Sequence, residues 1–332
     1  MRSVAAAVSA KRKLISIVVP AYNESECVDE LARRLQKVFG EEDAYDFEAI
    51  IVENGSVDDT YEKLLAIRAA DDRFKIIQLS RNFYMEGGMG AGLAHARGDA
   101  AVIMSADLED PPELIHDFIA KWEEGYENVY GVITKRKGTG IFRRAAAACF
   151  YWIINKMSDQ HVPRNASDFR LVDRSVYETF NSLQERSRMV RAMFSWVGFK
   201  SVGVEHEREV RHGGESHFQP VKTAGFAVRG ILANSNLPLK IIPFFGLALS
   251  FLSFFAIVII TWQALFYGVP FPGFGTLASL MFLAFGFLFC FLGVLSEYIG
   301  MIFQEVRQRP TYIVRETHGV ETPRVEGRER AR

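Results

Sequence analysis

The residues best suited to chemistry in this chain lie in one short acidic stretch, residues 105–112, with the sequence SADLEDPP. An apolar run with the pattern of a buried strand precedes it, and a segment with helical periodicity follows it. In an extended segment, Asp107 and Glu109 would point to the same side, about 7 Å apart along the chain. Two such carboxylates, with water and phosphate completing the shell, suit Mg²⁺ or Mn²⁺. The alternative is that these acids merely cap the following helix, and Asp110 in front of two prolines has the pattern of such a cap.

The elements that must position this stretch alternate between strands and helices. Helical segments of 10–15 residues separate the apolar, β-branched runs. This pattern is typical of a mostly parallel, doubly wound, Rossmann-like α/β sheet with right-handed crossovers. A glycine run at 87–92 lacks the spacing of a dinucleotide fingerprint, so we expect it to allow close helix packing. Strands are expected over 14–19, 47–52, 74–79, 100–104 and 128–133, and helices up to 39, over 57–70, from the glycine run onward and over 113–123.

Two further strand ends carry polar residues. Tyr22-Asn23-Glu24 follow the first expected strand, where Asn23 has the pattern of a helix cap, and Glu53-Asn54-Gly55-Ser56 follow the second. Because the carboxyl ends of parallel strands share one edge of a sheet, these clusters and the acidic stretch should converge on a single crevice. There, Glu53 could accept hydrogen bonds from a base N–H or from ribose hydroxyls. For any one cluster, turn formation alone is the alternative.

The net charge argues against a nucleic-acid binder, and the distribution of apolar residues indicates a membrane protein. The 332 residues carry a formal net charge of −1, so no global basic charge marks a partner such as nucleic acid. Residues 241–296 contain no Asp, Glu, Lys, Arg or His, which is enough chain for two membrane spans of about 20 residues each. We expect these spans near Leu239–Leu265 and Thr276–Phe303, with a turn at 267–275 between them.

Basic residues at the ends of the spans indicate their orientation. Lys240 lies at one boundary and Arg307 and Arg309 at the other, which by the positive-inside rule places both ends in the cytosol. The N-terminus does not have the pattern of a signal peptide, because its cations follow the weak apolar stretch 4–10 instead of preceding it. We therefore expect a multi-pass protein of the cell membrane with a cytosolic head. The three cysteines form no CxxC pair and should be reduced thiols without a structural metal.

These features divide the chain into five expected segments. Part of the tail is expected to pair with the head, and its last ten residues to be disordered. The segments are an N-terminal extension at 1–13, a catalytic head at 14–218, an interfacial helix at 219–238, two transmembrane helices at 239–303 and a cytosolic tail at 304–332.

Five motifs in this chain together resemble those of the family 2 glycosyltransferases with a GT-A fold. More narrowly, they resemble the polyprenyl-phosphate glycosyltransferases, relatives of dolichol-phosphate mannose synthase. The resemblance implies a GT-A head followed by a C-terminal two-helix transmembrane hairpin. It also implies a nucleotide-diphosphate sugar as donor, Mg²⁺ or Mn²⁺ as cofactor, and inverting transfer to a polyprenyl phosphate of the undecaprenyl or dolichyl type. The motifs are IVVPAYNE (17–24), ENGSVD (53–58), LSRNF (79–83), ADLEDPP (106–112) and SDFRL (167–171).

The resemblance assigns roles to most of these residues. It makes Asp107 a catalytic residue and, with Glu109, a ligand of the metal. Two departures concern the carboxylates: the family usually has Asp-Asp-Gly-Ser at 53–56, and it usually has Asp at 105 and Gln at 109. Ser105 removes one carboxylate from the usual motif, and Glu109 could replace it. Ser105 would then be a weaker or water-mediated ligand. The implied donor-binding residues are Pro20, Tyr22, Glu24, Glu53, Asn54, Ser80, Arg81, Asn82, Ser105 and Ala106.

A basic segment suggests where a lipid acceptor would bind. Residues 135–144 carry five cations and no acid, and they lead into the apolar, aromatic stretch 145–157. In a chain anchored to a bilayer this suits an element lying on anionic lipid, and the alternative is a solvated loop followed by a core helix. Arg136, Arg143 and Arg144 suit a lipid phosphate, because guanidinium groups bind phosphate oxygens bidentately.

Further acceptor-site residues are implied by the resemblance. Asp168 occupies the position of a site carboxylate. Since a lipid phosphate is mostly dianionic at neutral pH and already a nucleophile, we favour orientation of the acceptor or sugar over a general-base role. Arg170 could pair with Asp168 or with phosphate. Arg208, Arg211 and Ser216 match a segment that in relatives is thought to close over donor and lipid.

Three hypotheses for the function follow. The leading one is an inverting glycosyltransferase at the cytosolic membrane face. A second copy of the chain is a candidate partner, as in a homo-oligomer. A processive polysaccharide synthase is disfavoured, because the chain has no Gln-x-x-Arg-Trp motif and two spans are too few for an export channel. The third is an inactive membrane scaffold that kept the GT-A fold but lost its metal through the change at Ser105.

Overall fold

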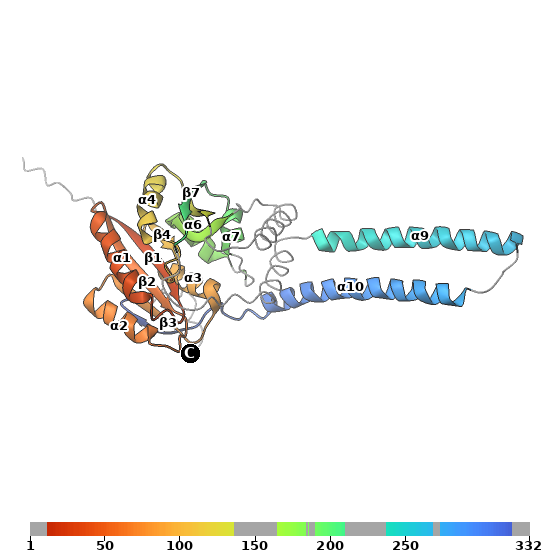
Figure 1. Ribbon diagram of the computed structural model, residues 1–332, viewed down its shortest axis with the longest axis horizontal. Helices are drawn as coiled ribbons and strands as arrows, with labels where there is room; N and C mark the ends of the chain where they lie inside the picture. The colour runs from red at the N-terminus through yellow and green to blue at the C-terminus, as the bar shows by residue number, and fades with distance from the viewer. Residues whose placement is uncertain are drawn as a thin grey trace, which may run out of the picture. The chain divides into compact units, whose positions relative to one another are not determined.

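The computed structural model describes residues 12–135, 165–183, 185, 190–209, 237–267 and 273–320 (Figure 1). The chain separates into two compact units. One unit, made of residues 1–149, 160–218 and 310–332, contains a β-sheet and the helices on its faces. The other, made of residues 150–159 and 219–309, contains two long apolar helices.

One eight-stranded sheet forms the centre of the first unit. Its strands are β1 (Lys13–Ala21), β2 (Tyr45–Glu53), β3 (Phe74–Leu79), β4 (Ala100–Ile103), β5 (Asn128–Lys135), β6 (Ala166–Asp173), β7 (Ser201–Glu207) and β8 (Val314–His318). They lie in the order β7-β5-β6-β4-β1-β2-β3-β8. All strands but β6 and β8 run in one direction. The predicted mostly parallel α/β sheet is confirmed, with one reversed strand inside it and another at its edge.

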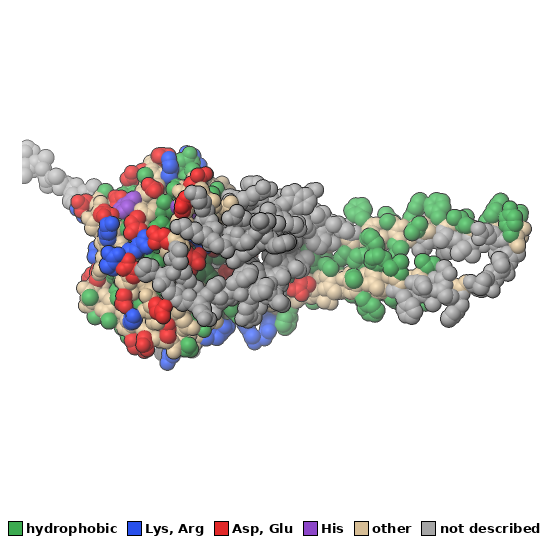
Figure 2. All heavy atoms as spheres, in the orientation of Figure 1, with side chains coloured by type: hydrophobic (Ala, Val, Ile, Leu, Met, Phe, Trp, Pro, Cys, Tyr) green, Lys and Arg blue, Asp and Glu red, His purple; other side chains and the backbone are tan. Residues whose placement is uncertain are grey.

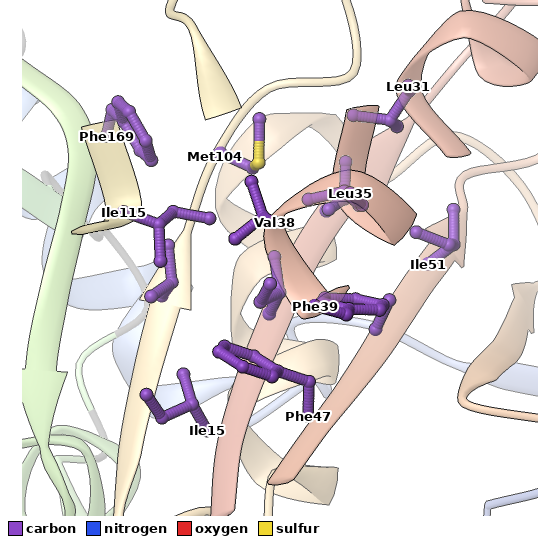
Figure 3. Packing of buried hydrophobic residues seen from close by; sticks show 14 of the residues in the cluster. Ile15, Leu31, Leu35, Val38, Phe39, Phe47, Ile51, Met104, Ile115 and Phe169 are labelled. Atoms are coloured by element: carbon purple, nitrogen blue, oxygen red, sulfur yellow. The ribbon is translucent and has the colours of Figure 1, made fainter. Parts of the chain in front are cut away.

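Helices cover both faces of this sheet. On one face the apolar side of α1 packs with α4 around Leu35, Phe39 and Ile115 (Figure 3). On the other face, Leu93, Phe180 and Phe194 of α3, α6 and α7 share a second core. The helices are α1 (Val28–Glu41), α2 (Thr60–Ala70), α3 (Tyr84–His95), α4 (Ile115–Glu123), α6 (Arg174–Ser182) and α7 (Val190–Trp196), with a 3-10 turn η1 (Pro112–Leu114) before α4.

The glycines of α3 bring this helix close to the strands beneath it. A Cβ added to Gly88 would lie 2.8 Å from Cβ of Pro20 in β1. A Cβ added to Gly92 would collide with the side chain of Val18 and lie 3.2 Å from Val52. Since real Cβ atoms do not approach this closely, only glycine permits the observed packing. The predicted packing role of the glycine run is confirmed.

The predicted helix cap at Asn23 is wrong. Helix α1 begins at Val28, its N-cap position is Cys27, and no side chain caps it. Asn23 lies in the preceding loop with a left-handed backbone (φ 54°). Its side-chain oxygen accepts a hydrogen bond from the backbone N–H of Val57, so it stabilises a contact between loops and not a helix end.

The segment after the apolar helices returns to the sheet. β8 pairs antiparallel with β3, and Ser80 donates its backbone N–H to Ile313 O at 2.9 Å. The hydroxyl of Tyr61 lies 2.9 Å from Nε2 of His318, which ties β8 to α2 as well. The expectation that part of the tail pairs with the head is confirmed.

The described part of the second unit consists of helices α9 (Leu237–Tyr267, 31 residues) and α10 (Phe274–Val306, 33 residues). The ring of Phe245 in α9 lies 5.0 Å from that of Phe287 and 5.5 Å from that of Phe291 in α10. The two helices are therefore in contact, and they cover the two regions where spans were expected.

Both helices expose large apolar side chains along their length, as Figure 2 shows. In the part of the chain that the structure describes, Leu283–Val306 is long and apolar enough to qualify as a candidate membrane span. That this stretch and α9 both cross a membrane stays a prediction. The predicted interfacial helix falls, apart from its last two residues, outside the described residues.

Candidate active site

The loops that follow β1 and β2 are joined by hydrogen bonds. Asn23 donates its backbone N–H to Ser56 Oγ at 3.0 Å, and Val57 donates its own to Asn23 Oδ1 at 2.9 Å. Glu24 donates its backbone N–H to Thr60 Oγ1, also at 2.9 Å. The two polar clusters predicted at these strand ends therefore meet at one edge of the sheet.

The loop after β3 reaches the same edge through Asn54. Its side-chain amide donates to Tyr84 O at 2.8 Å and accepts from the backbone N–H of Phe83 at 2.9 Å. Gly55 has a left-handed backbone (φ 74°), and a Cβ at this position would lie 2.6 Å from the backbone carbon of Arg81. Backbone from three strand ends is thus packed into one compact rim.

The predicted donor-binding residues lie on this rim and differ in exposure. The carboxylate of Glu53 is buried and accepts from the backbone N–H of Ser56, so it stabilises its own turn. A contact between Glu53 and a nucleotide stays a prediction. Pro20, Glu53, Asn54 and Ala106 are buried, Tyr22, Glu24, Asn82 and Ser105 are half-buried, and Ser80 and Arg81 are exposed.

The acidic stretch forms a turn, so the extended geometry expected for Asp107 and Glu109 is wrong. Leu108 between them has a left-handed backbone (φ 57°), and its side chain is buried in the core. Asp107 Oδ1 accepts a hydrogen bond from the backbone N–H of Glu109 at 3.2 Å. Burial of Leu108 and this local bond of Asp107 together favour the turn. Asp107 and Glu109 remain half-buried at the carboxyl end of β4.

Asp110 is not a helix cap, contrary to its sequence pattern. The N-cap position of the following turn is Pro111, and no side chain caps it. The buried Asp110 carboxylate instead accepts from Ser167 Oγ at 2.8 Å and contacts His206 Nε2 at 2.7 Å. Burial alone raises the pKa of Asp110, but the hydrogen bond from His206 and the charge of Arg208 outweigh it and lower the pKa to about 2.

Arg208 joins the end of β7 to the acidic turn. Its Nε and Nη2 each donate to one oxygen of Asp110 at 2.9 Å, and its Nη1 donates to Glu109 Oε2 at 2.7 Å. Burial lowers the pKa of Arg208, whereas the charges of Asp110 and Glu109 raise it, and the net shift is upward. A backbone bond from Glu209 N to Glu109 O at 2.9 Å adds a second link. Glu109 is therefore paired with Arg208, which it shares with Asp110.

Asp168 and Arg170 lie two residues apart on β6, beside an irregularity in its pairing with β5. Asp168 is half-buried. Arg170 is buried, with its guanidinium carbon 4.8 Å from the ring centroid of Phe194 and its Nη2 donating to Ser167 O at 3.1 Å. Contact between Arg170 and an acceptor phosphate stays a prediction.

The remaining predicted acceptor residues lie outside the described residues. The same holds for the apolar stretch 145–157. These residues are Arg136, Arg143, Arg144, Arg211 and Ser216.

The acidic turn offers few donors to a metal. Within the described ranges, no group of three or more His, Cys, Asp or Glu side chains is arranged to hold a metal ion. Mg²⁺ in phosphate-binding sites is commonly held by one or two carboxylates, with substrate phosphates and water supplying the other ligands. Asp107, with Glu109 beside it, fits that kind of site. The donors present therefore suit a cation that binds together with a diphosphate.

Comparison with known proteins agrees with this geometry. The model of the family described as glycosyl transferase family 2 matches residues 16–180. The chain is 40% identical to the uncharacterized glycosyltransferase YkcC of Bacillus subtilis (strain 168), over 93% of this chain and 96% of that protein. The chain belongs to glycosyl transferase family 2. This family 2 enzyme has the GT-A-like sheet that its motifs predicted.

Two further proteins are similar to this chain to different degrees. The family 2 enzyme is 35% identical to the SfII prophage-derived bactoprenol glucosyl transferase of Shigella flexneri, over 92% of this chain and 98% of that protein. Among solved structures, it is similar to mannosyl-3-phosphoglycerate synthase from Rubrobacter xylanophilus. That likeness has a TM-score of 0.46 and 16% identity over 67% of this chain and 72% of the other.

Sequence reasoning missed three features of the site. Ser167 belongs to a recognised motif, but its bond to Asp110 depends on β6 running antiparallel beside β4. His206 lies in a strand without any chemical signature, and only the sheet order brings it to the acidic turn. Asp110 was identified as a cap because the two prolines that follow it are typical of a helix start.

Proposed function

We propose that this family 2 enzyme transfers a glucosyl group from a nucleotide-diphosphate sugar to a polyprenyl phosphate of the undecaprenyl type. The transfer takes place at the cytosolic membrane face and inverts the anomeric centre. The observation that carries the proposal is the match to a bactoprenol glucosyl transferase over 305 residues, nearly the full length of both chains. A match of this extent includes the apolar helices as well as the sheet.

The rim at the carboxyl edge of the sheet suits the donor. Ligands of open α/β sheets bind outside the carboxyl ends of the strands. In this chain the loops that follow β1, β2, β3 and β4 begin at that edge. The buried, hydrogen-bonded Asn54 holds the loops after β2 and β3 in one arrangement. A preformed rim reduces the ordering that donor binding would otherwise require.

Asp107 and Glu109 are the residues that would hold Mg²⁺ or Mn²⁺. When bound, such a cation would neutralise the charge that develops on the leaving diphosphate. Within the turn, the bond from Glu109 N fixes the Asp107 carboxylate, and Arg208 fixes that of Glu109. Both carboxylates are therefore oriented by the protein itself.

The acceptor phosphate supplies the nucleophile in this proposal. It is mostly dianionic at neutral pH, so removal of a proton contributes little to its reactivity. Asp168, half-buried where β6 begins, is then assigned to orienting the acceptor or the sugar hydroxyls. The attacking phosphate oxygen forms a bond to the anomeric carbon as the nucleoside diphosphate leaves, which gives a glycosyl phospholipid.

Helices α9 and α10 support the membrane part of the proposal. Apolar side chains exposed around a helix indicate a lipid environment, and here Phe251 is 64% exposed and Phe289 68% exposed. We propose that both helices span the cell membrane as a hairpin with the head in the cytosol. This arrangement would bring the sheet and a lipid acceptor to the same surface.

The test is a transfer assay with the full-length chain in membranes. Undecaprenyl phosphate, Mg²⁺ or Mn²⁺ and one radiolabelled nucleoside diphosphate sugar are supplied, over a panel of bases and hexoses. We expect label in the lipid fraction with a glucosyl donor, and a product of one hexose on one lipid phosphate by mass spectrometry. A polymeric product would favour a polysaccharide synthase, and absence of transfer from every donor would refute the proposal.

A further inference from the structure

We propose that Asp110 is a positioning residue, which holds the acidic turn, the start of β6 and the end of β7 in the arrangement that transfer requires. The inference deepens the proposed function and rests on it. Its basis is the contact between one buried carboxylate and three residues from two distant segments: Ser167 in β6, and His206 and Arg208 at the end of β7.

The hydrogen-bonding capacity of Asp110 is fully used by these partners. Its Oδ1 contacts His206 Nε2 at 2.7 Å and Arg208 Nε at 2.9 Å. Its Oδ2 contacts Ser167 Oγ at 2.8 Å and Arg208 Nη2 at 2.9 Å. A carboxylate offers about four lone-pair sites, so these four contacts occupy them all. Asp110 thus has no site left for a metal ion or for the N-terminus of the following helix.

Arg208 links Asp110 to Glu109 through hydrogen bonds to both carboxylates. A guanidinium has five N–H donors. Four of them point to described partners: two to Asp110, one to Glu109, and one to Ser167 Oγ at 3.3 Å. Its orientation is therefore set by the buried carboxylate, and its Nη1 in turn holds the carboxylate that lies two residues from Asp107.

His206 holds Asp110 from strand β7. Its side chain is buried, and because the carboxylate accepts, Nε2 carries the proton. The ring packs on β5: a Cβ on Gly131 would lie 2.6 Å from its Cε1. The ring of Phe169 in β6 meets it edge-on at 6.5 Å. The histidine is fixed by two neighbouring strands, so its bond to Asp110 links the acidic turn to the sheet.

The first test is Asp110→Asn in the full-length enzyme, assayed in membranes with undecaprenyl phosphate and the glucosyl donor. The amide keeps the size of the side chain but removes the charge and one acceptor. We expect kcat to fall about 10- to 100-fold, the usual range for loss of a residue that orients a site carboxylate. The KM for the donor should stay within about threefold, because donor contacts are unchanged. Unchanged kcat with a lowered melting temperature would overturn the inference.

A matched pair at His206 tests the same contact from its other partner. His206→Gln keeps an N–H close to the position of Nε2, whereas His206→Phe keeps a ring and removes the donor. We expect the glutamine variant to retain kcat within about threefold and the phenylalanine variant to lose about tenfold or more. Equal kcat values for the two variants would contradict the positioning role. Arg33→Gln, on the exposed face of α1, is the control for handling of the protein.

Two measurements that do not depend on transfer separate this inference from the proposed function. Hydrogen exchange should become about tenfold faster in Asp110→Asn over residues 105–110 and 206–209, but not over β1 and β2. Binding of Mn²⁺ with a nucleoside diphosphate, followed by electron paramagnetic resonance, should weaken about 10- to 100-fold, because the carboxylates of the turn lose their fixed positions. Hydrogen exchange and Mn²⁺ binding that both match the unsubstituted enzyme would overturn the inference. If the unsubstituted enzyme shows no transfer, the exchange result still decides whether Asp110 holds the turn.

Discussion

Arg208 Nη1 lies 2.7 Å from Glu109 Oε2, so the acid that distinguishes this motif from its usual form is paired with a cation of the same chain. Asp107, two residues earlier, receives a backbone hydrogen bond instead. The two carboxylates therefore differ in availability, although the sequence presents them as equivalent. A cation that approaches the turn competes with Arg208 at Glu109 but not at Asp107.

This difference predicts unequal effects of removing the two charges. We expect Asp107→Asn to lower the transfer rate by at least about 100-fold, since it removes the carboxylate most available to the metal. Glu109→Gln should cost about tenfold or less, because its carboxylate is already engaged by Arg208. Initial rates and Mn²⁺ titration in the presence of a nucleoside diphosphate measure both effects. Equal losses in the two variants would show that the ion pair does not set the availability of Glu109.

Replacement of Arg208 by lysine should be damaging although the charge is kept. An ammonium group cannot donate along fixed directions to Asp110 and Glu109 together, as the guanidinium does. We expect Arg208→Lys to lower kcat about tenfold or more. Arg208→Met should in addition destabilise the head by about 3–5 kcal/mol, since it leaves the buried Asp110 charge without its cation. Thermal unfolding and kcat are the two measurements, and a lysine variant with full activity would contradict the bidentate role.

Two glycines provide a matched test of how α3 packs. Gly92→Ala places a methyl group against Val18 and Val52, so we expect a clear fall in melting temperature. Gly40, near the end of α1, has open space where its Cβ would lie. Gly40→Ala should therefore be neutral or stabilising by about 0.5–1 kcal/mol, as in an ordinary helix. Similar melting temperatures for the two variants would argue against close packing of α3 on β1.

Asp71 provides a pH test of the fold at a distance from the site. Hydrogen bonds from Arg73 lower its pKa to about 2 from 3.8, against the opposing effect of burial. A carboxyl with a lowered pKa in the folded state stabilises the fold above its unfolded pKa, and this stabilisation is lost as the pH falls toward the folded value. With Arg73 partly exposed, we expect Asp71→Asn to cost about 1 kcal/mol at neutral pH.

The cost of Asp71→Asn should disappear between about pH 4 and about pH 2. Melting temperatures of the substituted and unsubstituted chains over that range measure it. A gap that does not change with pH would mean that the charge of Asp71 contributes nothing to stability.

The periodicity of the sequence predicts five of the eight strands and the carboxyl edge of the sheet. The first four strands alternate with helices, which predicts their common direction. β6, β7 and β8 were not predicted. β6 enters the sheet beside β4 after a long excursion of the chain, and β8 arrives only after the apolar helices. Local periodicity does not contain information on pairings over such separations.

Within the site, residue types were predicted better than their partners. Asp107 and Glu109 do lie at the carboxyl end of β4, but the turn at Leu108 depends on burial of that side chain in the core. The partners of Asp110 are at positions 167, 206 and 208. A local sequence pattern does not predict contacts over such separations. A carboxylate before two prolines is locally typical of a helix cap, but in this tertiary structure it binds side chains from β6 and from the end of β7.

β8 follows α10 in the chain, yet it pairs with β3, which precedes α9. Both strands belong to one sheet and must therefore fold in one compartment. A chain that leaves this sheet after β7 and rejoins it at β8 can cross a bilayer only an even number of times. Parity thus excludes Leu283–Val306 as a lone crossing. If that stretch passes through a membrane, another segment must pass back, and α9 is the long apolar helix that the described chain provides for it.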